Sequence, residues 1–194
     1  MNVVLLAGGT GGGKLAAGLQ DVLGEELTVV VNTGDDTELH GLHVSVDPDL
    51  VTFWLADVID QERGWGFRDD AFVVHEHLQK LGAPGWFGLS DRDLATSLYR
   101  THFIAEGGTL TAAQAQIARA LGAVARVLPM SEDRVRTRVR TEAGWRELQE
   151  FLILDHGQGE VAEVELDGIA SAKPTPEVVA ALETAEIIVI APSN

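Results

Sequence analysis

Residues 2–36 read NVVLLAGGTGGGKLAAGLQDVLGEELTVVVNTGDD, and the order of apolar and glycine residues in this segment indicates how the fold begins. Residues 2–7 form a short apolar run that stops at a glycine cluster, and residues 14–23 then carry leucine and valine at helical spacing. A second apolar run, rich in valine, covers residues 27–31. A helix that joins two such strands makes them a parallel βαβ unit. The segment therefore predicts an α/β fold.

The glycine cluster between the first strand and the helix is the first candidate binding segment. Bare backbone N–H groups and the positive end of a helix can hold phosphate oxygens. We therefore expect phosphate to lie against Gly9, Thr10, Gly11 and Gly12, with Lys14 adding a positive charge. A purely structural turn is the alternative.

Two familiar phosphate-binding motifs fit this cluster only in part. The spacing from Gly8 to Lys14 is that of a P-loop, but Leu15 stands where Ser or Thr would bind Mg²⁺. A relaxed dinucleotide fingerprint also fits, but Asn32 rather than an acidic residue ends the second strand. An NAD-dependent oxidoreductase is therefore disfavoured.

Four aspartates follow the second strand within a short distance: Asp35, Asp36, Asp47 and Asp49. Ligands of α/β sheets bind at the carboxyl ends of the strands. Mg²⁺ bound with a diphosphate uses one or two protein carboxylates. The alternative is that Asp35 and Asp36 form an Asx turn and that Asp49 caps a helix.

The remaining pattern predicts further helices over residues 51–59, 70–81, 94–105, 112–121 and 174–185. Thr111 with Gln114 forms a capping-box pattern, and Gly122 ends the same helix. Strands are expected over residues 125–128 and 187–191. An antiparallel hairpin is expected over residues 134–141 and 145–154, with a third strand over residues 161–166.

Together these elements predict one nucleotide-binding domain over residues 1–194. The expected fold is α/β, with a Rossmann-like, doubly wound parallel sheet. A mostly helical segment covers residues 50–124, and a small antiparallel β insertion covers residues 131–167. Because such sheets normally continue after a strand like residues 187–191, we expect the chain to be part of a longer protein.

Composition excludes several classes of function. The chain has 14 Lys and Arg against 30 Asp and Glu, a formal charge of −16, which makes nucleic-acid binding improbable. It has no cysteine, so disulfides, thiolate catalysis and cysteine-ligated metals are excluded. No apolar run reaches the roughly 20 residues of a membrane span, and no basic residue precedes the first apolar run. We expect a cytoplasmic protein, and a homodimer remains open.

Several other polar and aromatic groups allow two interpretations. Asp91 can cap a helix and Arg92 and Asp93 can form a surface pair, or Asp91 and Arg92 can bind ligand. Trp65, between two glycines, can stack on a flat ring or cover the core. Four arginines occupy alternate positions along residues 134–140. This pattern favours a solvent-exposed strand face whose arginines pair with neighbouring acidic side chains. His75 and His77 are two apart on a helix and cannot share a metal.

Six motifs then occur in a recognisable order: residues 6–14, residues 30–36 with 40–42, residues 64–66, 86–96, 126–131 and 191–194. Together they resemble the 2-phospho-L-lactate transferase and phosphoenolpyruvate transferase family of coenzyme F-420 biosynthesis. The resemblance spans nearly the whole chain. It implies Mg²⁺-dependent transfer of a phospholactyl or phosphoenolpyruvyl group from a guanosine-diphosphate-linked donor to the ribityl hydroxyl of Fo, a deazariboflavin, with release of GMP.

The resemblance also implies roles for individual residues. Gly9 to Gly12 would face the donor phosphates, and Asp35 and Asp49 would hold metal or the ribityl chain of Fo. Asp91 and Arg92 would line the Fo region, and Ser193 and Asn194 would border the nucleotide.

The sequence departs from the family pattern at three places. The family's Pro-Asp-Leu-Asp stretch is here Val46-Asp47-Pro48-Asp49, which changes the turn between the two acids. Gly88 stands where some archaeal members carry a lysine, so the phosphoenolpyruvyl branch looks closer, although the donor's three-carbon acid stays open. Members also continue past the Pro-Ser-Asn motif.

These parts suit direct phosphoryl-type transfer, in which a metal and backbone amides offset charge while a carboxylate orients the attacking hydroxyl. Asp35 or Asp49 is the candidate for that carboxylate. The main rival function is a non-catalytic, nucleotide-sugar-binding regulator, because relatives of this superfamily share the glycine segment and the Asn-Thr-Gly-Asp-Asp type of motif.

Overall fold

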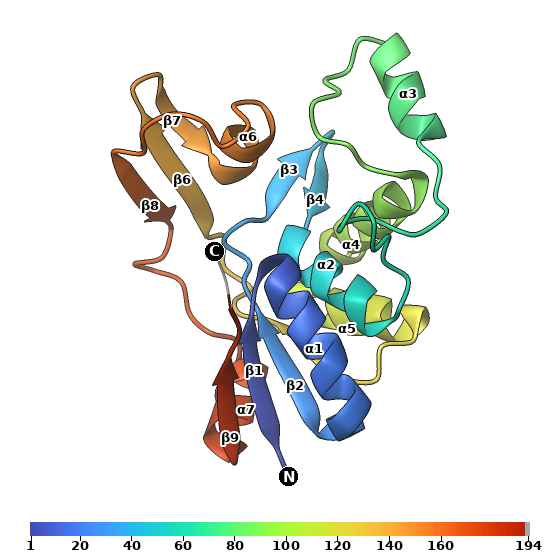
Figure 1. Ribbon diagram of the computed structural model, residues 1–194, viewed down its shortest axis with the longest axis vertical. Helices are drawn as coiled ribbons and strands as arrows, with labels where there is room; N and C mark the ends of the chain where they lie inside the picture. Colours follow the sequence, from blue (N-terminus) through green and yellow to red (C-terminus); the bar gives the residue numbers. More distant parts are fainter. Residues whose placement is uncertain (193–194) are drawn as a thin grey trace.

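The computed structural model describes residues 1–192 and contains a four-stranded parallel sheet at its centre (Figure 1). Its strands are β1 (Val3–Ala7), β2 (Leu27–Val31), β5 (Arg126–Pro129) and β9 (Ile187–Ile190). They lie in the order β5-β2-β1-β9. Along the chain, β2 and then β5 are added on one side of β1, and β9 is added on the other side. The strand order therefore reverses at β1, as in a Rossmann-like fold.

Helices cover both faces of this sheet, which confirms the doubly wound prediction. On one face, α1 (Gly9–Leu23), α2 (Val46–Leu55) and α5 (Leu110–Leu121) enclose a core that includes Leu5, Val29 and Val127. On the other face, α7 (Pro176–Thr184) packs on Val4, Val30 and Leu128. The inner strands read as continuous apolar runs because both of their faces are buried.

Strand β9 lies at one edge of the sheet and is less covered than β1. Ile187, Ile188 and Ile190 are all exposed, and Ile190 is the most exposed of the three. None of the helices within residues 1–192 combines the length and the apolar character needed to cross a bilayer.

Helix α1 begins earlier than expected, because the glycine cluster forms its first turns rather than a loop in front of it. A Cβ on Gly12 would lie 2.9 Å from the Ala7 Cβ, and one on Gly13 would lie 2.5 Å from the Trp54 ring. These glycines allow α1 to approach β1 and α2 closely. Their low helix propensity is overridden by this packing.

Helix α2 also begins earlier than expected, at Val46 rather than at residue 51, and so includes Asp47 and Asp49 in its first turn. In front of it, β3 (Thr37–Leu39) and β4 (Leu42–Val44) form a short antiparallel hairpin that was not predicted. The hairpin turns at His40 and Gly41, both with positive φ.

Two further helices, α3 (Val73–Lys80) and α4 (Asp91–Ala105), complete the helical segment, with a single 3₁₀ turn, η1 (Gly24–Glu26), before β2. The predicted capping box of α5 is wrong. Thr109 is the N-cap, and its side chain accepts a hydrogen bond from the N–H of Ala112. Gln114 is instead fully buried, where its amide donates to the Pro48 carbonyl. Gly122 ends the helix in the left-handed conformation, as predicted.

The β insertion is confirmed, although one of its strands is shorter than expected. Strands β6 (Arg136–Thr141), β7 (Gly144–Glu147) and β8 (Glu163–Asp167) form an antiparallel sheet in the order β7-β6-β8. The second half of the expected strand over residues 145–154 is a helix, α6 (Leu148–Ile153), which begins at a capping box of Glu147 and Glu150.

Most arginines of this insertion lie on a solvent-exposed face and pair with acidic side chains, as the alternating sequence pattern predicted. Arg134 pairs with Asp167, and Arg140 pairs with Glu163, each at 2.9 Å, on the exposed side of the small sheet. Arg136 is the exception, because it is buried.

Candidate functional site

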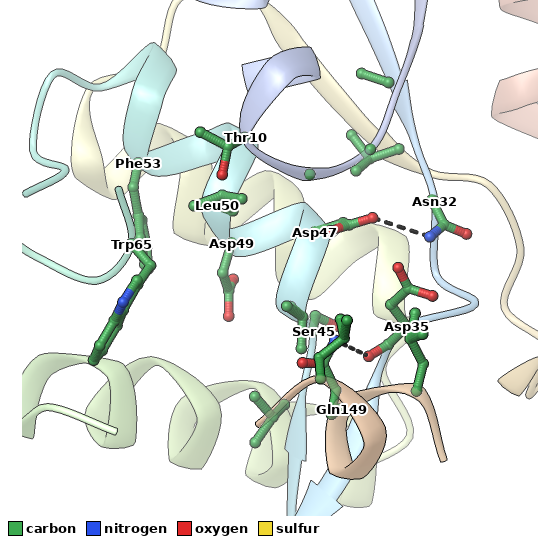
Figure 2. A pocket seen from close by; sticks show the side chains of 18 of the residues that line it. Thr10, Asn32, Asp35, Ser45, Asp47, Asp49, Leu50, Phe53, Trp65 and Gln149 are labelled. Carbon is green, nitrogen blue, oxygen red and sulfur yellow. Dashed lines mark hydrogen bonds between the residues drawn. The ribbon is translucent and has the colours of Figure 1, made fainter. Parts of the chain in front are cut away.

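A large cavity of about 1140 Å³, here called the central cavity, opens at the carboxyl ends of β1 and β2. Its walls also include the end of β9, the first turn of α2 and one side of α6. The cavity therefore lies where the strand order reverses, the position at which α/β sheets bind ligands. Figure 2 shows Trp65 at one end of it and Asn32 with Asp35 at the other. We call the first the aromatic end and the second the glycine end, because Gly8 and Gly9 also line the cavity there.

At the glycine end, the start of α1 faces the cavity through Gly8, Gly9 and Thr10. No side chain caps this helix, and its first turn contains no acidic residue. Gly9 has a φ of +61°, and a Cβ there would meet nothing within 4 Å. An uncapped helix start with open space in front of it attracts anions such as phosphate.

Asn32 connects the glycine end to the acidic segment. Its side-chain nitrogen donates to Asp47 Oδ2 at 3.0 Å, and its side-chain oxygen accepts from the N–H of Gly34 at 2.9 Å. These two bonds fix the orientation of the amide. Gly8 leaves room for this arrangement, because a Cβ there would lie 2.9 Å from Asp47 Oδ2.

Asp47 is a buried carboxylate and Asp35 a half-buried one, and the charge of Asp35 acts on Asp47. Burial raises the pKa of Asp47 to about 6, and the nearby charge of Asp35 contributes, while Asn32 and the N–H of Gly9 favour the charged form. Burial likewise raises the pKa of Asp35, although Thr137 Oγ1 donates to Asp35 Oδ1 at 2.9 Å. Thr137 belongs to β6, so the insertion helps to build the site.

Asp49 points elsewhere, into a buried ion pair. Side chains two positions apart on a helix are separated by roughly 200° around its axis, so Asp47 and Asp49 cannot share one direction. Asp49 pairs with Arg100 of α4, whose guanidinium is fully buried and also bonds to Gln114 at 3.3 Å. Burial raises the pKa of Asp49 to about 6 even though Arg100 favours its charged form. Asp49 still reaches the wall of the cavity.

Asp36, the remaining aspartate of the segment, has a supporting position. It is buried, and its Oδ2 accepts hydrogen bonds from His43 Nε2 at 2.8 Å and from Ser45 Oγ at 2.9 Å. These bonds tie the end of β2 to the β3–β4 hairpin and to the start of α2. Asp36 thereby holds in place the backbone that carries Asp35.

The aromatic end of the cavity is enclosed by Phe53, Trp65, Trp86 and Phe87. One acidic group, Asp93, also lines it, and Asp93 is 8% exposed. The prediction that Arg92 and Asp93 form a surface pair is wrong, because Asp93 is buried. The Ser90-x-x-Asp93 spacing signals a capping box that would fix this side chain. The structure contains that capping box at the start of α4.

Several predicted site residues lie outside the cavity wall. Lys14 is exposed and lies over the Trp54 ring, 5.4 Å from its centroid. Asp91 accepts from the N–H of Val74 at 2.9 Å, and Arg92 is exposed beside Phe67. Their contact with a ligand stays a prediction.

The later glycines of the cluster serve packing. A Cβ on Gly11 would lie 2.8 Å from the Pro192 carbonyl oxygen, and Gly12 packs on Ala7. Ser193 and Asn194, predicted to border a nucleotide, lie outside the described residues.

The charge of the central cavity is one-sided. Among the described residues that line it are four aspartates, Asp35, Asp47, Asp49 and Asp93, and no lysine, arginine or histidine. Within residues 1–192 no group of three or more acidic or histidine side chains gathers closely enough to hold a metal ion. Two carboxylates without a cationic partner, the half-buried Asp35 and the buried Asp47, nevertheless fit Mg²⁺, which completes its shell with waters and phosphate oxygens.

Comparison with known proteins gives a consistent result. The family model described as 2-phospho-L-lactate transferase CofD matches residues 3–194. The chain is 40% identical over 193 residues to a 2-phospho-L-lactate transferase from Methanosarcina barkeri, covering 99% of this chain and 62% of that protein. It is 40% identical over 200 residues to a phosphoenolpyruvate transferase from Streptomyces griseus, covering all of this chain and 63% of that protein.

Among solved structures, a UPF0052 family protein from Bacillus halodurans is similar, with a TM-score of 0.62 and 20% sequence identity. The match covers 98% of this chain and 58% of that one, and it supports the fold alone. The chain thus spans less than two thirds of the length of each of these three proteins.

Proposed function

This chain belongs to the 2-phospho-L-lactate transferase CofD family, and from that premise we propose that its protein is a transferase of coenzyme F-420 biosynthesis. The proposed reaction moves a phospholactyl or phosphoenolpyruvyl group from a guanosine-diphosphate-linked donor to a ribityl hydroxyl of the deazaflavin Fo. The observation that carries the proposal is the central cavity itself, where an uncapped helix start and paired aspartates face an aromatic-walled space.

The glycine end suits the donor's diphosphate. The N–H groups at the start of α1 would bind phosphate oxygens, and Gly9 leaves space for a close approach. Asp35 and Asp47 would hold Mg²⁺, with Asp49 within the same cavity. When bound, the metal would offset negative charge on the diphosphate. That compensation is needed here because no cationic side chain of the described residues lines the cavity.

The aromatic end suits the acceptor. Trp65 and the neighbouring aromatic side chains would contact the flat deazaflavin ring and leave its ribityl chain directed toward the aspartates. In the proposed step the hydroxyl oxygen bonds to the donor's outer phosphorus. The bridging P–O bond then breaks, and GMP leaves with the electron pair of that bond. A carboxylate, Asp35 or Asp49, orients the hydroxyl and takes its proton.

The test is a transfer assay on a protein that spans the full length of the relatives. We expect GMP release that requires Fo, the guanosine diphosphate donor and Mg²⁺ together. Asp35→Asn and Asp49→Asn should each reduce the rate by at least roughly a hundredfold, the lower end of the range for one positioned acid–base group. Asp57→Asn is the matched control, because that carboxylate is 79% exposed and lies outside the cavity wall. Nucleotide binding without any GMP release would instead favour the non-catalytic regulator.

A further inference from the structure

Asp93 is held in one orientation by its own helix. It is the third residue of α4, and both the N–H and the hydroxyl of Ser90 donate to its Oδ2, at 3.0 Å and 2.8 Å. The Ser90 hydroxyl in turn caps the helix. A side chain fixed in this way keeps its other oxygen, Oδ1, in a defined position.

Asp93 Oδ1 has no hydrogen-bond donor among the described residues, although the side chain is more than nine-tenths buried. The nearby cation, Arg63, is engaged elsewhere, because it pairs with Asp60 at 2.9 Å and donates to the Phe67 carbonyl at 2.7 Å. The other charged neighbour, Asp70, is also acidic and raises the pKa of Asp93, as burial does. A carboxylate oxygen that has no donor, in a residue that is otherwise mostly buried, favours a donor from a ligand.

The space beside Asp93 is kept open by glycine. A Cβ on Gly66 would lie 3.4 Å from Asp93 Oδ2, and a Cβ on Gly88 would lie 3.5 Å from the Trp65 ring. Gly66, Gly88 and Trp65 all line the central cavity with Asp93. The result is an aromatic surface with a hydrogen-bond acceptor at its border.

We propose that Asp93 is a specificity-determining residue, whose Oδ1 accepts a hydrogen bond from an N–H or O–H at the edge of a flat heteroaromatic acceptor lying on Trp65. The inference rests on the proposed function and adds to it the group that distinguishes this acceptor from other ring systems. A ring without an edge donor would cover this oxygen without pairing it, and would therefore bind more weakly.

Asp93→Asn tests this inference at a single atom. The asparagine oxygen can still accept both bonds from Ser90, so the capping box is retained, while the cavity-facing acceptor becomes a donor. By isothermal titration calorimetry we expect the dissociation constant for Fo to rise roughly tenfold to a hundredfold, the effect of losing a hydrogen bond to a charged group. The dissociation constant for guanosine diphosphate with Mg²⁺ should stay within about twofold. In turnover, KM for Fo should rise while kcat at saturating Fo is retained.

Two controls separate this role from a structural one. Asp57→Asn, outside the cavity wall, should leave both dissociation constants unchanged. If Asp93→Asn does not fold, Asp93→Ser also removes the carboxylate, keeps the Ser90 cap of α4 and should show the same loss for Fo.

Three outcomes would overturn the inference. They are an unchanged affinity for Fo in Asp93→Asn, an equal loss of Fo and nucleotide binding, and a loss of Fo affinity in Asp91→Asn but not in Asp93→Asn. The proposed function fails separately, when the wild-type protein neither binds Fo nor releases GMP, and the inference then fails with it.

Discussion

Replacing Asp47 with asparagine is expected to stabilise the metal-free protein at neutral pH, and the gain should disappear as the medium becomes acidic. Burial raises the pKa of Asp47 from 3.8 to about 6. The folded protein therefore binds this proton more tightly than the unfolded chain does. The contribution of Asp47 to the free energy of unfolding consequently falls as the pH rises from 3.8 to about 6 and is constant above that range.

The size of the effect follows from the same two values. One pKa unit corresponds to about 1.4 kcal/mol, so keeping Asp47 ionised in the folded protein costs about 3 kcal/mol at pH 7.5. Asparagine has a similar shape and carries no charge. It can still accept the bond from the Asn32 amide. The variant should therefore exceed the wild type by up to about 3 kcal/mol at pH 7.5 and by little at pH 3.8.

Urea denaturation in EDTA at several pH values between 3.8 and 7.5 measures this difference directly. The raised pKa of Asp49 affects both proteins equally and cancels in the comparison. Asp57→Asn serves as the control, because it removes a carboxylate that is mostly exposed and lies outside the cavity wall. A difference that does not vary with pH, or a variant less stable than wild type at pH 7.5, would refute the reasoning.

Three further predictions follow from the same contacts. Adding Mg²⁺ should raise the melting temperature of the wild type in differential scanning fluorimetry, and the rise should be lost in Asp47→Asn, whereas equal rises would argue against a metal site there. Arg100→Met should destabilise by about 3–5 kcal/mol in urea because it leaves Asp49 buried and unpaired, and adding Asp49→Leu should recover much of that loss. Gly13→Ala should destabilise by about 1–3 kcal/mol because its Cβ would meet an indole ring, while Gly18→Ala, which meets nothing within 4 Å, should be neutral or stabilising in the same denaturation experiment.

Much of the fold could be predicted because the buried strands are continuous apolar runs between glycine or aspartate segments. The start of α1 could not be predicted in the same way. Glycine disfavours helices, and the contacts of Gly12 and Gly13 that override this preference come from Ala7 and Trp54, one of them distant in sequence. Local propensity contains no information about such contacts. The reason is different for α6, where the local capping box of Glu147 and Glu150 ends a strand that the apolar pattern continued.

In the candidate site, sequence patterns located the aspartates but did not predict the direction of each side chain. The acidic segment was identified, but a choice between Asp47 and Asp49 depends on where α2 begins, since that fixes the direction of each side chain. The partners that distinguish them, Asn32 and Arg100, come from β2 and α4. The same holds for Asp93. Its capping role could be predicted from the Ser90-x-x-Asp93 spacing, but the oxygen that has no donor can be identified only in the folded structure.

Within residues 1–192 the outer edge of β9 is unpaired, which has a practical consequence for handling this 194-residue chain. Apolar edge strands with unpaired backbone groups promote intermolecular sheet formation. Glu183 and Glu186, just before Ile187–Ile190, and Pro192 just after it act as gatekeepers against such pairing. Part of this protection is electrostatic repulsion, which salt screens over about 8 Å at physiological ionic strength. Aggregation at high protein concentration should therefore increase with added sodium chloride, which favours low-salt buffers for storage.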